Sequence, residues 1–179
     1  PTGIKFSSYY PKYIKLILAT LTLIYSIFQF FENNIGNGIA LIFLMIIFIF
    51  LYFKNEIILL AFLRLRKQDF DGTEKWLNKI KNPESALTKK QVGYYNYLRG
   101  IISSQTNLTV AEKFFKKAIA IGLSMNHDLA MAKLSLAGIL IQKRRKREAT
   151  ILLNEAKKID KQKMLSDQIK MMQQQMKRI

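Results

Sequence analysis

The sequence predicts an all-α protein: a two-helix transmembrane hairpin at residues 1–53, a short helical-repeat domain at residues 54–160, and a C-terminal amphipathic helix at residues 161–179. Three observations lead to this prediction. Two long apolar runs stand close together near the start of the chain. A pattern of small and large residues recurs in the second half, and apolar residues at spacings of four and three close the sequence.

The two apolar runs predict the hairpin. The first span is expected at about residues 13–31 and the second at about residues 38–53, each close to the roughly 20 residues that cross a bilayer. The polar turn NNIGNG between them is too short for a domain. A cleaved signal peptide is one alternative, but no small-residue cleavage site follows the first run. A buried hairpin of a soluble protein is the other, and it would need a larger domain to cover it.

Positive charges near the two spans predict the orientation. Lys5, Lys12 and Lys15 precede the first span, basic residues follow the second, and the connecting turn has neither lysine nor arginine. The positive-inside rule then places both termini and the repeat domain in the cytosol. We expect an integral protein of a bacterial inner membrane.

The junction between the hairpin and the repeats is very short. Only Lys54, Asn55 and Glu56 separate the second span from the sequence IILLAFLRLRK at residues 57–67. We expect one continuous helix that leaves the membrane and becomes the first repeat helix. Such a helix would hold the repeat domain rigidly against the bilayer.

A self-match with a shift of 38 residues predicts three helix pairs. The shift pairs Gly100 with Gly138 and, in the weaker first copy, with Phe62. The glycines are expected to let the first helix of each pair touch the second. The shift also aligns three triads, with small residues expected where two helices approach closely: Thr73, Leu77 and Ile80; Ala111, Phe115 and Ala118; Ala149, Leu153 and Ala156.

Two capping patterns indicate where helices start. Thr109 and Glu112 fit a capping box, and Asp71 and Glu74 have the same spacing. Thr109 and Asp71 each stand two residues before the first member of the triad of their unit, so we expect them at the starts of second helices.

The stretch YYNYLRGIISSQTNLTVAEKFFKKAIAIGL at residues 94–123 resembles the tetratricopeptide repeat (TPR). The resemblance covers about residues 57–160, although the period is 38 residues where that family has 34. It implies a right-handed stack of helix pairs with a concave, partner-binding groove. First helices at about residues 57–67, 90–104 and 128–142 would line the groove. We expect three side chains to face it: Tyr94, Tyr97 and Arg99. For the two tyrosines, packing between repeats is the alternative.

The charge of the chain is concentrated after the hairpin. The 179 residues have a formal net charge of +17, and residues 54–179 hold 26 basic and 11 acidic residues, a charge of +15. This charge favours an anionic neighbour, for which the candidates are nucleic acid, anionic lipid and an acidic protein. The chain has no cysteine, which excludes disulfides and thiolate metal sites.

The densest positive charge is expected in the turn of the third unit and precedes a helix that begins near Glu148. One interpretation is a solvated turn. The other is a nearby anion, which is indicated by one physical point: cations at a helix N-terminus are unfavourable. The run has no aromatic residue beside it, which favours phosphate-backbone contact over specific RNA reading. The run comprises five predicted partner-binding residues: Lys143, Arg144, Arg145, Lys146 and Arg147.

The C-terminal sequence carries one apolar helical stripe at Leu165, Ile169, Met172, Met176 and Ile179. One interpretation is a capping helix that covers the last repeat. The other is a free helix for the groove of a partner, for which methionines suit an adaptable contact.

No catalytic pattern is present in the sequence. His127 stands alone, the acidic residues are scattered, and no phosphate-binding glycine loop or nucleophile motif occurs. We therefore expect no enzyme, cofactor, metal or small-molecule substrate. The expected function is a membrane-anchored adaptor or scaffold, a subunit of a larger membrane complex, whose basic surface binds an acidic protein or peptide near membrane lipids. The alternative is an accessory factor of a secretion or insertion machinery that contacts ribosomal RNA phosphate.

Overall fold

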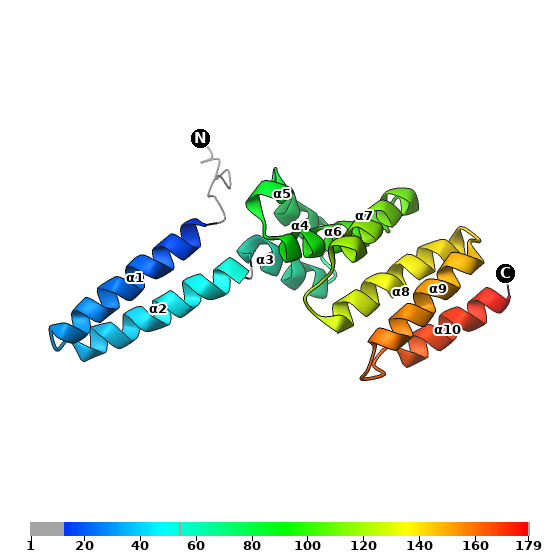
Figure 1. The fold of residues 1–179 in the computed structure, drawn as a ribbon. Coiled ribbons are helices and arrows are strands. Elements are labelled where there is room, and N and C mark those ends of the chain that lie inside the picture. The colour runs from blue at the N-terminus through cyan, green and yellow to red at the C-terminus, as the bar shows by residue number, and fades with distance from the viewer. Residues whose placement is uncertain (1–12, 54, 179) are drawn as a thin grey trace, which may run out of the picture.

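The computed structural model describes residues 13–53 and 55–178 (Figure 1). Within these residues the chain forms ten helices and no strand, which confirms the prediction of an all-α protein. A two-helix hairpin projects from one end, and the remaining helices form the rest of an elongated molecule.

Helices α1 (Ile14–Phe31) and α2 (Ile35–Phe53) form the hairpin, and both are long and apolar enough to cross a membrane. Only 17% and 6% of their apolar windows are buried, so neither is covered as a core helix of a soluble protein would be. Between them, Ser26 Oγ donates to the Gly38 carbonyl oxygen at 2.8 Å. Because α2 begins at Ile35, Gly38 lies inside this helix, and the turn between α1 and α2 is shorter than the predicted NNIGNG segment.

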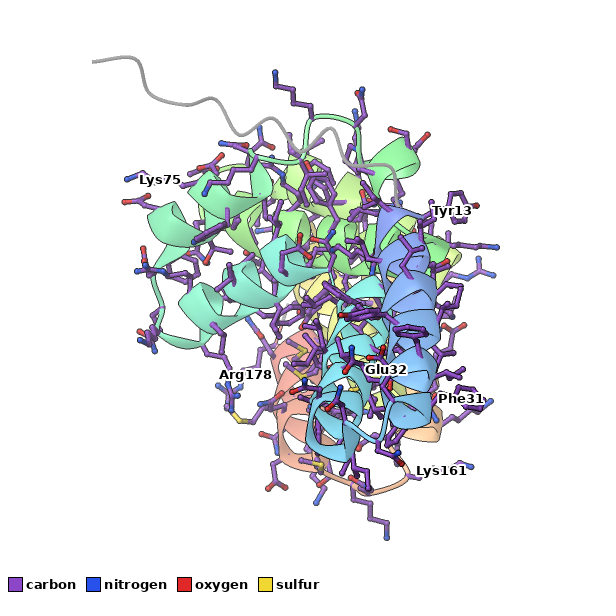
Figure 2. All side chains as sticks on the ribbon, turned by 90° about the vertical axis from the view of Figure 1, so that its left-hand side faces the viewer. Tyr13, Phe31, Glu32, Lys75, Lys161 and Arg178 are labelled. Carbon is purple, nitrogen blue, oxygen red and sulfur yellow. The ribbon has the colours of Figure 1, made fainter. Side chains whose placement is uncertain are left out.

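Aromatic residues stand at both ends of α1. Figure 2 shows Tyr13 at one end of the helix and Phe31 beside Glu32 at the other. Phe31 is 82% exposed, which places a large apolar ring at the tip of the hairpin. This arrangement matches the aromatic belts of membrane interfaces.

The expected continuous helix from the second span into the first repeat is wrong. Helix α2 ends at Phe53, and α3 (Glu56–Arg66) begins after Asn55, whose ψ of 127° is not helical. The Asn55 side chain accepts from the backbone N–H of Ile57 at 3.0 Å and caps the new helix. Asparagine strongly prefers this capping position, and that preference outweighs the continuity of the apolar pattern.

Polar contacts hold the hairpin to the repeats in place of a continuous helix. The Lys15 ammonium pairs with Glu56 and lies 3.3 Å from the Leu51 carbonyl oxygen. From helix α6, Gln91 Nε2 donates to the Tyr52 carbonyl oxygen at 2.8 Å. The carbonyl groups at the end of α2 therefore have partners from both sides of the junction.

Three helix pairs follow the junction, with each first helix packed on its second helix. The second helices begin 38 residues apart, at residues 70, 108 and 146, and the first helices begin within two residues of the expected positions. The short helix α5 (Pro83–Ala86) lies between the first two pairs. The pairs are α3 with α4 (Phe70–Leu77), α6 (Lys89–Ser103) with α7 (Leu108–Ile121), and α8 (Asn126–Gln142) with α9 (Lys146–Ile159).

Both predicted capping positions are two residues too late. Helix α7 is capped by Asn107, whose side chain accepts from the N–H groups of Thr109 and Val110, so Thr109 lies inside the helix. Helix α4 is capped by Asp69, so Asp71 also lies inside its helix. Asparagine and aspartate are at least as good at the cap as threonine, and here they stand earlier in the chain.

The predicted triads form the core of the helix pairs. All nine side chains are at most 4% exposed, including the large Leu77, Phe115 and Leu153 in the middle positions. A Cβ on Gly100 would lie 2.9 Å from the Phe115 ring, so this glycine lets α6 touch α7 as expected. At Gly138 the expectation is wrong: among the described residues outside its own helix, such a Cβ would meet Met172 Cε of the C-terminal helix at 3.2 Å and no atom of the second helix within 4 Å.

Helix α10 (Ser166–Lys177) packs against α9 and α8. Leu165 and Ile169 of the predicted stripe are buried, and Met172 and Met176 pack against the same core. Ile179 lies outside the described residues. This packing favours the capping interpretation over a free helix.

Candidate partner-binding surfaces

A pocket of about 220 Å³ lies between the first helices of the three pairs, beside the hairpin junction. Helix α3 supplies an apolar wall with Ile58, Leu59 and Phe62. The remaining lining residues are more polar: Asn55, Lys90, Gln91, Tyr94, Ser124 and Asp128. First helices of all three pairs therefore contribute to the lining of this pocket.

Tyr94 is the one predicted tyrosine that reaches this pocket. Its hydroxyl donates to Asp128 Oδ2 at 2.6 Å, which joins α6 to α8. Burial, the hydrogen bond and the charge of Asp128 raise the pKa of Tyr94 to about 12, so the phenol stays neutral at physiological pH. The Lys90 ammonium is on the same lining, which gives the pocket one apolar wall and one charged end.

Tyr97 does not face a groove. It is 7% exposed, and its ring centroid lies 6.0 Å from that of Phe115 and 6.3 Å from that of Phe62. Burial raises the pKa of its hydroxyl to about 12. The expectation that Tyr97 contacts a partner is wrong, because its position on α6 points into the packing between units.

Arg99 joins helices within the domain. Its guanidinium donates to Asn78 Oδ1 at 2.6 Å and lies 3.6 Å from the Glu74 carboxylate. Its Nε donates to the hydroxyl of Tyr95 at 3.1 Å. These bonds hold the end of α4 against α6, so the packing interpretation applies to Arg99 as well.

The basic run at residues 143–147 has an anion within the protein itself. Glu112 of α7 is 7% exposed and accepts from Lys143 at 2.7 Å, from Arg145 at 2.6 Å and from Lys116 at 2.7 Å. Arg145 also pairs with Glu148 at 2.6 Å. These bonds fix the α8–α9 turn to α7, and they give Lys143 and Arg145 carboxylate partners within the protein, so neither cation needs an external anion.

The hydrogen bonds to these cations lower the pKa of Glu112 to about 2. Burial acts in the opposite direction, but three cations on one carboxylate outweigh it. Glu112 therefore stays ionised far below neutral pH. Two of its partners, Lys143 and Arg145, lie 31 and 33 residues away in the chain.

Three cations of the run remain exposed and have no ion pair among the described residues: Arg144, Lys146 and Arg147. Arg144 has a φ of 59°, which turns the chain sharply before α9. The open part of the predicted basic surface is thus smaller than the sequence indicates.

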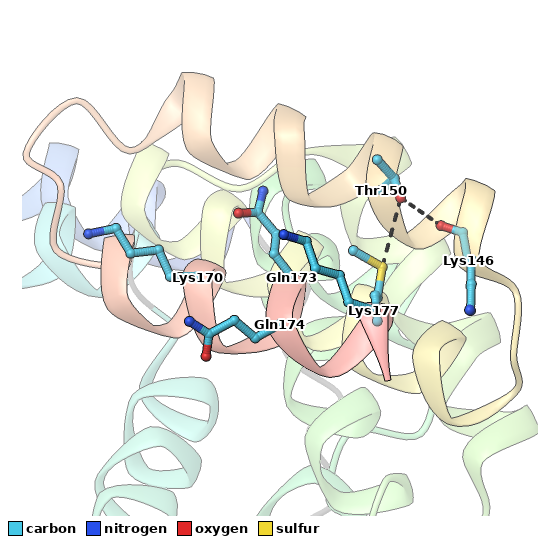
Figure 3. Close-up of a pocket in the computed structure, with 7 residues that line it drawn as sticks. Lys146, Thr150, Lys170, Gln173, Gln174 and Lys177 are labelled. Atoms are coloured by element: carbon cyan, nitrogen blue, oxygen red, sulfur yellow. Dashed lines mark hydrogen bonds between the residues drawn. The ribbon is translucent and has the colours of Figure 1, made fainter. Parts of the chain in front are cut away.

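Lys146 lines a groove of about 510 Å³ between α9 and α10 (Figure 3). Seven residues line it: Lys146, Thr150, Lys170, Gln173, Gln174, Met176 and Lys177. None of these carries a carboxylate, so the groove holds three positive charges and no negative one. We call it the basic groove.

The sequence prediction missed the α10 side of the basic groove. The signal was present as the spacing of Lys170, Gln173, Gln174 and Lys177, which places all four on one face of a helix. The sequence prediction considered only the apolar stripe of the same helix. Only the packing of α10 beside α9 brings this face next to Lys146.

Within the described residues no group of three histidine, aspartate or glutamate side chains is placed to hold a metal ion. Comparison with family models, curated proteins and solved structures finds no match.

Proposed function

We propose that this chain is a membrane-anchored, TPR-like adaptor that holds a basic protein-binding surface on the cytosolic side of a membrane, as a subunit of a larger complex. One observation carries the proposal: two exposed apolar helices are fastened directly to a strongly basic domain of helix pairs.

The exposed apolar side chains of the hairpin support the membrane anchor. Leaving such surface in water costs about 25 cal/mol per Å², and soluble monomers rarely expose large contiguous apolar patches. The exposed residues run the length of both helices, from Ile17 to Phe31 and from Ile35 to Phe50. A bilayer covers such a surface on all sides.

The paired helices support a binding role over a catalytic one. The helix pairs are stacked in chain order, and the first helices leave an open pocket. Residues 54–179, the repeat domain with the C-terminal helix, carry a net charge of +15, and exposed cations such as Arg144, Lys146 and Arg147 have no ion pair among the described residues. Stacked helix pairs with an open charged face suit the recruitment of an acidic partner.

Affinity purification of the full chain from membranes in a neutral detergent tests the proposal. We expect co-purifying protein that is retained by the wild type and lost when Arg144, Lys146 and Arg147 are all changed to glutamine. The matched control changes Lys157, Lys158 and Lys161 to glutamine, which removes the same charge elsewhere. Loss of the partner from both variants, or from neither, would contradict a specific basic surface.

The exposed cations Arg144, Lys146 and Arg147 support one second candidate, an accessory factor of a secretion or insertion machinery that contacts RNA phosphate. Lysine ammonium groups bind phosphate as point charges, and guanidinium groups bind it through paired hydrogen bonds. Phosphate binding predicts a steep fall of affinity with salt, with a log–log slope near the number of contacts. A protein partner with an apolar contact predicts a much shallower slope.

A further inference from the structure

The basic groove has a regular geometry in addition to its charge. On α10, Lys170 and Lys177 lie seven residues apart, which is about 10.5 Å along the helix, and Gln173 and Gln174 lie between them. On α9, Lys146 and Thr150 are one turn apart and form the facing wall. Figure 3 shows the two walls running side by side, with the Thr150 hydroxyl 3.8 Å from Met176 Sδ.

The lining of the basic groove is partly apolar. Met176 is a half-buried lining residue, and its thioether suits an adaptable apolar contact. The two glutamines offer both donors and acceptors. An occupant is therefore expected to carry negative charge at a two-turn spacing and an apolar side chain between the charges.

Nucleic acid fits this lining poorly. The lining has no aromatic ring or guanidinium group on which a base can stack, and a phosphate backbone has no apolar group for Met176. The phosphate oxygens of a nucleic acid only accept hydrogen bonds, so they leave the carbonyl oxygens of Gln173 and Gln174 without a donor. These observations favour a peptide over RNA.

Anionic lipid fits the position of the groove poorly. Helices α9 and α10 lie at the end of the molecule away from the hairpin, with the other helix pairs between (Figure 1). Attraction to a charged membrane surface falls off within a Debye length, about 8–10 Å at physiological salt. The groove therefore faces solution and its partners there.

We propose that the basic groove binds an acidic amphipathic helix of a partner protein, laid along α9 and α10. Its carboxylates, two turns apart, pair with Lys170 and Lys177, a further carboxylate pairs with Lys146, and an apolar side chain contacts Met176. This inference deepens the proposed adaptor function and rests on it, because it names the site and the chemistry of the recruited partner.

Fluorescence anisotropy with a labelled peptide and the full chain in neutral detergent tests the proposal. The probe is an alanine-based helical peptide with glutamates two turns apart and a leucine between them. The control peptide has the same composition with its glutamates on opposite faces. The groove variant carries Lys146→Gln, Lys170→Gln and Lys177→Gln, and the charge-matched control variant carries Lys157→Gln, Lys158→Gln and Lys161→Gln.

We expect the groove variant to bind the probe about tenfold more weakly, because three exposed ion pairs are lost. The control variant should bind it within about twofold of the wild type, and the control peptide should bind the wild type as weakly as the groove variant binds the probe. Circular dichroism of both variants checks that the helices remain folded.

Three outcomes would overturn the proposal. Equal weakening in the two variants would mean general charge attraction. Equal binding of the two peptides would mean that no helical spacing is read. Binding of a labelled oligouridine that is lost in the groove variant, without peptide binding, would identify a phosphate polymer as the occupant. If the groove variant still co-purifies the membrane partner, the adaptor function stands and only this site is wrong.

Discussion

Glu112 shows how a single residue changes the interpretation of a charged segment. Its carboxylate holds Lys143 and Arg145 of the basic run and Lys116 of its own helix. Two of the five cations of the run are therefore bound within the protein, and the other three remain exposed. The carboxylate pKa falls to about 2 from an ordinary value of 4.5, so the ionised form stabilises the fold.

The change Glu112→Gln is expected to lower the free energy of unfolding by about 2 kcal/mol at neutral pH, because cations then face a neutral amide. A lowered pKa in the folded state contributes stability that is complete above about pH 4.5 and is lost as pH falls toward 2. The difference between wild type and variant should therefore close over that interval. Urea unfolding in neutral detergent, followed by circular dichroism, measures it.

Glu148→Gln is the control for this prediction. Glu148 pairs only with Arg145 and is about half exposed, so the loss should stay within about 1 kcal/mol. A difference between wild type and Glu112→Gln that does not change with pH would show that the carboxylate charge is not the cause.

At the scale of helices, the sequence repeat and the structural repeat agree in the triads but differ at the glycines. Gly100 faces Phe115 of its own pair, whereas Gly138 faces Met172 of α10. The last pair is followed by a helix that packs on it, and this neighbour takes the space beside Gly138. Equivalent positions in a sequence repeat therefore meet different surroundings at the end of the array.

Alanine substitutions at the two glycines should have opposite effects. Gly100→Ala would place a methyl group 2.9 Å from the buried Phe115 ring, at an expected cost of about 1–3 kcal/mol. Gly138→Ala meets only the flexible end of Met172 at 3.2 Å and gains about 1 kcal/mol of helix propensity. Thermal unfolding of the two variants checks this, and equal effects would contradict the difference in packing.

At the scale of the whole molecule, apolar surface and positive charge are separated at a defined junction. The hairpin ends at Phe53, Asn55 begins a new helix, and the pairs Lys15 with Glu56 and Gln91 with Tyr52 join the two parts. A short capped junction with these bonds still restricts how far the helix pairs swing. The side-chain contacts of Lys15 and Gln91 restrict this movement, in place of the unbroken helix that the sequence predicted.

The proposed orientation can be tested with single cysteines because the chain has none of its own. Asn34→Cys lies in the hairpin turn and Gln105→Cys in the turn before α7, and both positions are exposed. In intact cells a membrane-impermeant maleimide should label Asn34→Cys, and it should label Gln105→Cys only after permeabilisation. Labelling of Gln105→Cys in intact cells would contradict a cytosolic repeat domain.

The sequence by itself determined the features that depend on local periodicity. Apolar runs of span length, the 38-residue shift of the triads and the stripe of α10 each appear as regular spacings, and the helices form accordingly. Helix ends were less well determined. Asn107 and Asp69 cap their helices, although Thr109 and Asp71, two residues later, are also suitable capping residues.

Only the tertiary structure decided which side chains are free to bind. It buried Tyr97 between two aromatic rings, gave Lys143 and Arg145 an internal carboxylate, and brought Lys146 beside Lys170 and Lys177. Each of these results joins residues 18 or more positions apart, Tyr97 with Phe115 being the shortest separation. Such contacts depend on how helices pack against one another, which the spacing within a single helix does not specify.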